Sequence, residues 1–468
     1  MSQAERTEQP VVIIGGGFTG AAVAWHLAHR RPAGSAPVVI VEPRAVLGAG
    51  LAYSAAERCH RTNVPARRMC LSTADRGAFQ RWLEARPEQD ADEIVAGARF
   101  PSRALFGAFV AAQLQPLLAA GRVRHVRQRA GAAVPDGCGF RIVLEDGTAL
   151  QAGALVLATS HPAPAVPAAL APLHGAPGFF ACATDPGLAD AIGRDDRVLI
   201  VGSGLTMADV VAALDARGHR APVTALSRRG LRSREQATAC LEPFGDFTAR
   251  PVHRASALVR TVRATVREAA AAGVPWQAVL DRVRNDGQAI WQALSPQARL
   301  RVARHLRVFW DVHRFRIAPQ VAGVLERRAG EGLFDLRAGY LAGAAAQAGG
   351  LTVRWRPRGT QALQQGCFDA VVVATGPAHG DIVCRNPVVA SLAGAGLVGL
   401  DPTGLGLATT RTARAVGCDG QVCENLFIAG PLARGTFGEL MGLPEVTAHA
   451  ELVAAELAAR LAGHQAAA

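Results

Sequence analysis

Lysine is the first residue that the sequence lacks, since all 50 of its basic residues are arginines. Without a lysine amine, the chain cannot form a Schiff base with a carbonyl substrate or with pyridoxal phosphate. The formal net charge is +12, but the arginines are scattered and no aromatic residues alternate with them, as a base-stacking surface requires. The composition therefore argues against nucleic acid as a partner and favours anionic cofactors and substrates.

Cysteine motifs and long apolar runs are also missing. None of the nine cysteines forms a Cys-x-x-Cys pair, and the two nearest in sequence, Cys418 and Cys423, have no histidine cluster beside them. This argues against a redox-active disulfide and a zinc site. Apolar runs such as Val371–Ala374 are far too short to span a bilayer, and the polar segment 1–10 is unlike a signal peptide. We expect a cytoplasmic protein without metal or membrane contact.

The composition suits an α/β protein, since half of the residues are hydrophobic and 50 are glycines. The length of 468 residues predicts two or three domains. Its most informative stretch is Val11–Gly20, where four β-branched residues predict a buried strand. Gly15, Gly17 and Gly20 follow with the spacing G-x-G-x-x-G and lead into an apolar helix. The first glycine permits a tight turn, the second lets a pyrophosphate approach the backbone, and the third lets the helix pack closely.

Phe18 and Thr19 stand between these glycines, where the helix amides would face the phosphates. A second strand, Pro37–Val41, ends at Glu42, about twenty residues past the motif, where an acid can accept hydrogen bonds from a ribose. Strand, turn, helix and acid together predict a dinucleotide-binding unit. The alternative is a glycine-rich turn in an ordinary α/β domain.

Two further segments of the first half offer contacts to a ligand. The loop Pro43–Ser72 is long and rich in hydrogen-bond donors, and it includes Asn63, so we expect it to cover a ligand rather than to lie in solvent. Arg103 opens the next helix, where its side chain can reach a cofactor or point into solvent.

The opening pattern then repeats. A strand over Arg197–Val201 precedes Gly202 and Gly204, with Ala208 read in place of the third glycine. The following strand ends at Arg228 and Arg229 instead of an acid. Arginine binds a 2′-phosphate that an acid would repel, so this unit favours NADPH over NADH. The alternative is that the pair belongs to a generally arginine-rich surface.

The remaining sequence is helical over residues 258–310 and contains Asp311 and His313 as candidates for acid–base or substrate contacts. Asp311 is equally able to pair with an arginine on its own helix. A strand followed by Ala-Thr occurs twice, in Ala154–Ser160 and Asp369–Pro377, once after each glycine unit. A late strand ends at Gly430, and the last helix begins at Pro444.

These features resemble flavoproteins with two dinucleotide-binding domains. The resemblance implies an α/β protein with two Rossmann-like domains, of which the FAD domain is discontinuous (1–165 and 360–468), with a NAD(P) unit at 190–255 and a helix-rich insertion at 256–359. More narrowly, the chain resembles a bacterial group of FAD/NAD(P)-binding proteins that includes a FAD-dependent urate hydroxylase, and more distantly flavin N-hydroxylating monooxygenases that act on ornithine or lysine.

The resemblance implies that FAD lies on the first glycine unit, with Glu42, Asn63, Arg103 and Gly430 near it, and that NAD(P)H lies on the second. It implies a monooxygenase that consumes NAD(P)H and O2 to hydroxylate a small electron-rich substrate, with urate, converted to 5-hydroxyisourate in purine catabolism, as the first named candidate.

The alternatives are N-hydroxylation of an amine or amino acid, a flavin oxidoreductase that does not hydroxylate, and a nucleotide-sensing module. Two departures from the usual pattern are Gly430-Pro431 in place of Gly-Asp and Ser160-His161 after the first Ala-Thr strand. The sequence leaves the substrate and the oligomeric state open.

Overall fold

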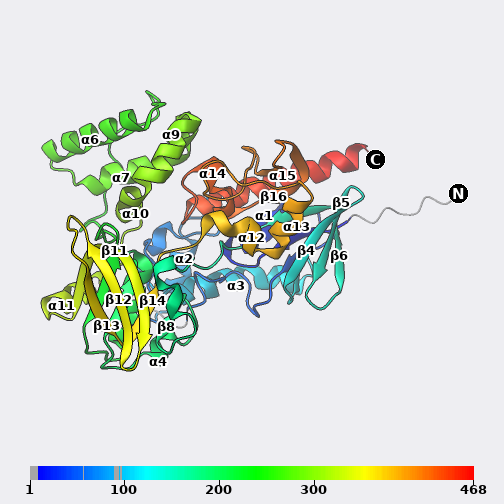
Figure 1. Ribbon diagram of the computed structural model, residues 1–468. Helices are drawn as coiled ribbons and strands as arrows, with labels where there is room; N and C mark the ends of the chain where they lie inside the picture. The colour runs from blue at the N-terminus through cyan, green and yellow to red at the C-terminus, as the bar shows by residue number, and fades with distance from the viewer. Residues whose placement is uncertain (1–8, 56, 89–93, 95–96, 468) are drawn as a thin grey trace.

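The computed structural model describes residues 9–55, 57–88, 94 and 97–467 of the chain. Two sheets, each carrying one of the glycine turns, form two domains, and a group of helices stands beside both (Figure 1). This arrangement confirms the predicted α/β class with two Rossmann-like domains. None of the described helices is long and apolar enough to cross a membrane.

The first sheet has six strands in the order β15-β16-β7-β1-β2-β3. The strands are parallel except for β15, which runs antiparallel to β16. Strand β1 is central and fully buried because its β-branched residues face helices on both sides of the sheet. The strands are β1 (Val11–Ile14), β2 (Val38–Val41), β3 (Val123–Val126), β7 (Ala154–Leu157), β15 (Arg414–Val416) and β16 (Val422–Ile428).

Helices and a small antiparallel sheet complete the first domain. Helix α1 (Phe18–Arg30) follows β1 and packs against α3 and the C-terminal helix α15. The later elements therefore return to the first glycine turn, as the discontinuous domain predicts. The other elements are α2 (Ala78–Glu84), α3 (Arg103–Ala119), α12 (Ile382–Arg385), α13 (Pro387–Gly394), α14 (Arg434–Phe437), α15 (Glu445–Ala467), β4 (Ala130–Asp136), β5 (Gly139–Leu144) and β6 (Ala149–Ala152).

The second sheet has seven strands in the order β13-β12-β11-β10-β9-β14-β8. Strands β11, β10, β9, β14 and β8 are parallel neighbours, and β12 and β13 extend the edge in antiparallel pairing. The elements of this domain are β8 (Phe179–Phe180), α4 (Leu188–Ala191), β9 (Val198–Val201), α5 (Leu205–Ala216), β10 (Val223–Ser227), α11 (Pro319–Gly330), β11 (Phe334–Gln347), β12 (Gly350–Pro357), β13 (Gln364–Phe368) and β14 (Ala370–Val373).

The strand pairing corrects two expected domain boundaries. Strands β11 and β12 lie inside the range expected for the helical insertion, and β13 and β14 inside the range expected for the FAD domain, yet all four belong to the second sheet. The correction has a physical reason: a buried apolar run such as β14 fits any sheet interior equally well, and only the three-dimensional path of the chain selects its neighbours.

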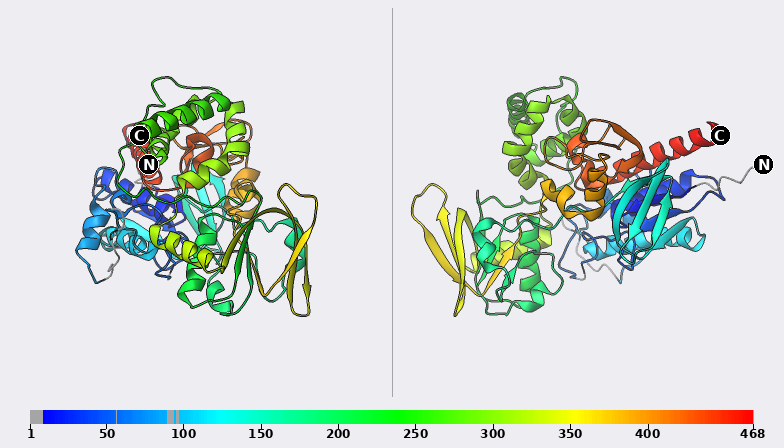
Figure 2. Two further views of the ribbon diagram at one scale, coloured as in Figure 1. Left: turned by 90° about the vertical axis from the view of Figure 1, so that its left-hand side faces the viewer. Right: turned by 45° about the vertical axis from the view of Figure 1, so that its right-hand side comes forward.

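The helical insertion is consequently shorter than expected. It comprises α6 (Ala255–Ala271), α7 (Trp276–Asn285), α8 (Gly287–Ala293), α9 (Pro296–Arg301) and α10 (Arg307–Arg314). Figure 2 shows these helices standing above the second domain and beside the segment that leads into α15. The indole of Trp291 fixes this contact by donating a hydrogen bond to the carbonyl of Gly435 at 2.7 Å.

Candidate cofactor and substrate site

The first glycine turn is tightly enclosed by backbone. Gly15 has φ +105°, and a Cβ there would lie 2.6 Å from the carbonyl oxygen of Ala158 at the end of β7. A Cβ at Gly20 would lie 1.9 Å from the carbonyl oxygen of Gly15. Both positions therefore require glycine, the first for its backbone conformation and the second because α1 packs directly on the turn.

The start of α1 presents free amides to this turn. Gly17 is the N-cap residue, and no side chain caps the helix among the described residues. The helix begins with Phe18 and Thr19, both buried. Uncapped amides and the positive end of the helix dipole form a binding site for an anion. We call the turn and the free amides of α1 the first cradle. A dinucleotide pyrophosphate fits it, and binding this group remains the predicted role of Gly15, Gly17, Phe18, Thr19 and Gly20.

Glu42 lies where the sequence places it, at the end of β2 and beside the turn. Its carboxylate is buried and accepts hydrogen bonds from the amides of Gly16 at 2.9 Å and Arg44 at 3.0 Å. Two backbone donors hold the carboxylate in one orientation next to the phosphate cradle. Its contact with a ribose remains a prediction.

The loop after β2 covers the glycine turn. The amide of Gly48 donates to the carbonyl of Gly16 at 2.8 Å, and a Cβ at Gly50 would lie 2.8 Å from Cα of Gly17. Tyr53 then packs edge-on against Phe106, with ring centroids 4.8 Å apart. The first half of the predicted covering loop therefore forms a roof over the cradle.

Gly430 joins the end of the chain to the first unit. It opens a short 3₁₀ helix, η5 (Gly430–Ala433), with φ +69°, and a Cβ there would lie 2.5 Å from Oγ1 of Thr19. Its amide donates to Nδ1 of His449 at 3.1 Å. Because Pro431 follows, no carboxylate stands at this position. His449 belongs to no sequence motif and was not among the expected residues.

The second glycine turn repeats the first with less covering. Gly202 has φ +126°, and a Cβ there would lie 2.2 Å from the carbonyl oxygen of Ala374 at the end of β14. Gly204 is the uncapped N-cap of α5, and a Cβ there would meet no atom within 4 Å. This turn is a second anion cradle, open on the side where the first is roofed.

The structure corrects the position of the third small residue in the second unit. The amide of Ala208 donates to the carbonyl of Gly204 at 3.3 Å, as the amide of Ala21 donates to Gly17 at 3.0 Å. Ala208 therefore corresponds to Ala21, and Met207 stands at the position of Gly20. The sequence motif placed the third small residue one position too late, at Ala208, because Met207 at the proper spacing is not small.

Arg228 and Arg229 follow β10 as predicted. The side chain of Arg228 is exposed, whereas the guanidinium of Arg229 stacks over the ring of Phe309 at 4.9 Å. Their position at the end of the second strand of the unit is the one from which a 2′-phosphate is read. Their selectivity for NADPH remains a prediction.

Arg103 takes part in a contact between the two domains. Its guanidinium forms a bidentate ion pair with Asp209 on α5, with distances of 2.7 and 3.0 Å, and donates to the carbonyl of Arg61 at 2.8 Å. These contacts tie α3 of the first domain to α5 of the second. The geometry therefore gives Arg103 a part in the domain contact, and its contact with a cofactor remains a prediction.

A cavity of about 860 Å³ lies where the two domains and the helical insertion meet. Asn63 and His449 line it from the first domain, Gln236 and Cys240 from the second, and Asp281 from the insertion. Its charged lining comprises six arginines, Arg67, Arg68, Arg76, Arg284, Arg314 and Arg316, and three acids, Asp281, Glu439 and Glu445. The excess of positive charge suits a ligand with an anionic group.

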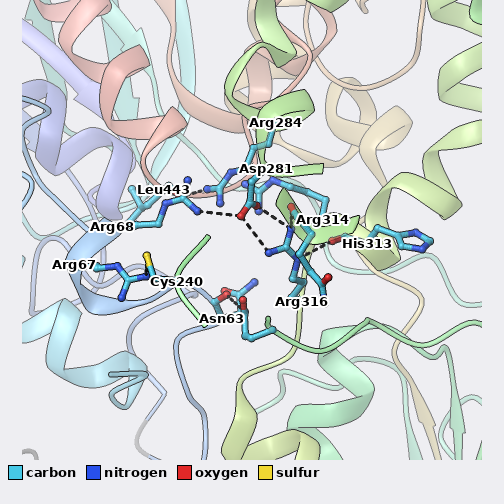
Figure 3. A network of polar contacts seen from close by, with 12 residues as sticks. Asn63, Arg67, Arg68, Cys240, Asp281, Arg284, His313, Arg314, Arg316 and Leu443 are labelled. Atoms are coloured by element: carbon cyan, nitrogen blue, oxygen red, sulfur yellow. Dashed lines mark hydrogen bonds and ion pairs between the residues drawn. The ribbon is translucent and has the colours of Figure 1, made fainter. Parts of the chain in front are cut away.

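Most of these charges are paired. Arg284 donates to Glu445 at 2.6 and 2.9 Å. Burial by itself would raise the pKa of Glu445, but Arg284 and Arg314 outweigh it, so the pKa lies below its usual value. The Glu439 carboxylate lies 3.0 Å from Arg314, and Arg316 reaches Asp281 at 2.8 Å. The other three arginines form no close ion pair with a described acid. Arg67 donates to the Cys240 sulfur, Arg76 is exposed, and Arg68 lies 3.8 Å from Asp281, its nearest described acid (Figure 3).

Asp311 and His313 do not line this cavity. Burial raises the pKa of Asp311, whose carboxylate accepts a hydrogen bond from Arg307 at 3.3 Å on its own helix. The His313 Nδ1 pairs with the carbonyl of Phe309 at 2.7 Å on the exposed side. The inward face of α10 carries Trp310 and Arg314 instead, of which Trp310 donates to Glu439 at 3.0 Å.

Two histidines meet where the chain leaves the two Ala-Thr strands. The rings of His161 and His379 contact edge to face, with centroids 4.1 Å apart. Burial lowers the pKa of His161 to about 4 and that of His379 to about 2, with Arg434 and Arg307 adding to the effect. Both imidazoles are therefore neutral at pH 7.

Residues 12–162 match a protein family described as FAD-NAD(P)-binding. This match and the two cradles confirm FAD and NAD(P) as the predicted class of cofactor. No curated protein matches the sequence.

Solved structures resemble this chain over nearly its whole length. The ornithine hydroxylase of Pseudomonas aeruginosa is 16% identical with a TM-score of 0.65, covering 97% of this chain and 100% of that one. L-lysine 6-monooxygenase of Pseudomonas syringae is 17% identical with a TM-score of 0.62, covering 97% and 99%. The ornithine N-hydroxylase of Kutzneria sp. 744, a complex with reduced FAD, NADP⁺ and L-ornithine, is 15% identical with a TM-score of 0.61, covering 98% and 100%.

At these identities the likeness shows a shared fold. It agrees with the predicted oxidoreductase and with the more distant of the two predicted resemblances, to flavin N-hydroxylating monooxygenases. The predicted resemblance to a urate hydroxylase receives no support from these matches.

Proposed function

We propose that this protein is a FAD-dependent monooxygenase that consumes NADPH and O2 and hydroxylates the nitrogen of a small amine. The observation that carries the proposal is the placement of a roofed and an open dinucleotide cradle in two domains that share one cavity. The likeness to an ornithine hydroxylase, an L-lysine 6-monooxygenase and an ornithine N-hydroxylase over at least 97% of the chain supports the choice of reaction.

The chain's own residues would have distinct tasks in this reaction. The first cradle and Glu42 would hold FAD, and the second cradle with the arginine pair would hold NADPH. FAD, when bound, supplies the transfer of electrons between NADPH and O2. The helical insertion closes the cavity with buried ion pairs such as Arg284–Glu445, which exclude water and orient the substrate.

Arg68 is the residue that we assign to an anionic group of the substrate. It is about one-third exposed, and its guanidinium donates no hydrogen bond to a described residue. An amino acid would place its carboxylate there, whereas a diamine has no group for it. The same excess of arginine favours urate, which carries negative charge at neutral pH, as a second candidate.

The decisive experiment measures NADPH oxidation, O2 uptake and free peroxide with FAD-reconstituted protein. The panel contains L-ornithine, L-lysine, cadaverine and urate. We expect an amino acid to stimulate O2 uptake without an equal yield of peroxide, and mass spectrometry to show one added oxygen. O2 uptake that is matched by an equal yield of free peroxide with every compound of the panel would contradict a monooxygenase and favour an oxidoreductase that does not hydroxylate.

Arg68→Met sharpens the substrate assignment. We expect it to raise KM for the accepted amino acid about tenfold, the value of one charge-assisted hydrogen bond, with little change for cadaverine. Arg220→Met is the matched control, since Arg220 is an exposed arginine of the second domain paired with Asp195.

A further inference from the structure

His449 is a buried histidine with one nitrogen used and one left over. It lies in the second turn of α15, and the residue is 4% exposed. Its Nδ1 is 3.1 Å from the amide nitrogen of Gly430. Because a backbone amide can only donate, Nδ1 accepts and carries no proton, so a neutral ring must carry its proton on Nε2.

The Nε2–H of His449 has no acceptor among the described residues. The ring packs edge-on against Phe437, with centroids 4.4 Å apart, and it lines the cavity shared by the domains. A buried donor without an acceptor is costly, and native proteins rarely leave one. The acceptor should therefore belong to a molecule that occupies the cavity.

The charge state of the ring makes it a donor only. Burial lowers the pKa of His449 to about 3, so the imidazole stays neutral throughout the physiological range. With Nδ1 occupied and Nε2 protonated, it can neither accept a proton from a substrate nor attract an anion by charge. What it can offer is one fixed hydrogen bond to a neutral or partly negative acceptor.

The position of Gly430, the hydrogen-bond partner of His449, points to the cofactor of the first domain as this molecule. Gly430, which holds the ring, lies against Thr19 in the first turn of α1. The imidazole, Gly430 and the FAD cradle thus form one packed unit, whereas Arg68, which we assign to the substrate, lies on η1 (Ala66–Arg68). The isoalloxazine of FAD offers carbonyl oxygens and ring nitrogens as acceptors.

We propose that His449 is a FAD-binding residue whose Nε2–H donates a hydrogen bond to the isoalloxazine. This inference rests on the proposed function in one respect, namely that FAD is the resident cofactor of the first unit. The proposal gives the last helix a side-chain hydrogen bond to FAD. Gly430 and Pro431 cannot make such a bond, since neither residue has a polar side chain.

Two substitutions separate the two nitrogens of the ring. His449→Asn keeps an acceptor near the Nδ1 position for the Gly430 amide and removes the distant donor. His449→Gln places an amide donor near the Nε2 position. Titration of the apoprotein with FAD, followed by flavin fluorescence, gives the dissociation constant without any turnover. Thermal melting of each apoprotein checks its folding.

We expect His449→Asn to weaken FAD binding about tenfold, the effect of one buried hydrogen bond, and to move the flavin absorption bands, while His449→Gln stays within about twofold of the natural protein. An unchanged FAD affinity and spectrum in a folded His449→Asn protein would overturn the proposal and indicate a buried water as the partner. An effect on substrate KM alone would overturn it as well.

A measurement on the natural protein covers the case in which His449→Asn does not fold. With ¹⁵N-labelled histidine, the Nε2–H resonance that is missing from His449→Gln should shift when FAD is added, and the Nδ1 signal should keep the character of an acceptor. An Nε2–H resonance that FAD leaves in place would overturn the proposal. Natural protein that binds no FAD would instead refute the proposed function.

Discussion

The two dinucleotide units of this protein share the glycine turn between a strand and a helix, and they differ in the segments around this turn. In both, a glycine with positive φ follows a buried strand, and its missing Cβ makes room for the carbonyl of an Ala-Thr strand, Ala158 in the first unit and Ala374 in the second. In both, the following helix begins uncapped. The first turn is roofed by the loop that contains Gly50, whereas a Cβ added at Gly204 in the second turn would meet no described atom within 4 Å.

This difference teaches how one motif can serve two kinds of ligand. A roofed cradle suits a cofactor that stays bound, because the loop must open before the ligand leaves. An open cradle suits a ligand that exchanges in every cycle. The side chains agree with this division, since Glu42 is buried beside the first turn and Arg228 is exposed beside the second.

The largest expected effect tests the packing of the first unit. Gly20→Ala places a Cβ 1.9 Å from the carbonyl of Gly15, so α1 must move and FAD binding should be lost. The free energy of unfolding should fall by about 3 kcal/mol, at the upper end of overpacking effects. Bound flavin per chain and urea unfolding of the apoprotein measure the two effects.

The control in the open unit is Gly204→Ala, at the counterpart of Gly17, where an added Cβ would meet no described atom within 4 Å. We expect unchanged stability and normal FAD content, with weaker NADPH binding because the backbone can no longer approach the pyrophosphate. A flavin-loaded Gly20→Ala protein would show that the two cradles do not differ in the way described.

The second prediction tests the recognition of the nicotinamide cofactor. Replacing both Arg228 and Arg229 by alanine should lower kcat/KM for NADPH about 50-fold, the value of a charge-assisted contact with a phosphate, and leave that for NADH nearly unchanged. Glu42→Gln should reduce FAD content without altering the ratio of the two cofactors. If kcat/KM fell equally for NADPH and NADH, the two arginines would not be the residues that bind the 2′-phosphate.

The third prediction uses the histidines that follow the two Ala-Thr strands. Burial holds the pKa of His161 at about 4 and that of His379 at about 2, below the unfolded value of about 6.5. Below pH 6.5 the unfolded chain therefore binds more protons than the folded one, and stability must fall as the pH falls.

Each such histidine contributes a slope of up to about 1.4 kcal/mol per pH unit between pH 6 and 4.5. His379→Phe should reduce the slope by that amount while keeping the ring contact with His161. Urea unfolding at pH 7, 6 and 5 measures it. A slope unchanged in His379→Phe would mean that His379 titrates equally in both states.

The smallest expected effect concerns the link between the units. Alanine substitutions of Arg103 and Asp209, alone and together, should give a coupling energy of about 1 kcal/mol, because the pair is bidentate but partly exposed. Arg220 and Asp195 form the control pair, whose exposure predicts no measurable coupling. Equal coupling in both pairs would deny Arg103 a special role between the domains.

Local patterns predicted the parts of this protein that depend on local geometry. Gly15 and Gly202 could be found because a strand, a tight turn and a helix follow one another within a few residues. The end of β2 at Glu42 could be found for the same reason. Asp311 and His313 do not line the cavity, and Asp311 pairs with Arg307, as the second interpretation of the sequence allowed. The sequence of one amphipathic helix does not say which of its polar residues face a neighbouring domain.

Apart from Asn63, which belongs to the predicted covering loop, the residues that line the cavity could not have been found in this way. Arg68, Arg284 and Arg314 are three among 50 arginines, and only their meeting with Asp281, Glu439 and Glu445 sets them apart. His449 carries no motif, and its meaning comes from a hydrogen bond to Gly430, 19 residues earlier in the chain. Contacts of this kind depend on the path of the whole chain.

The sequence by itself determined that this protein has two dinucleotide cradles, because glycine spacing and β-branched runs act through the backbone over short distances. The tertiary structure decided which strands join which sheet, which cradle is roofed and which side chains face the cavity. The physical reason is that buried apolar strands and scattered arginines are interchangeable in sequence, and packing between distant segments gives each one its neighbours.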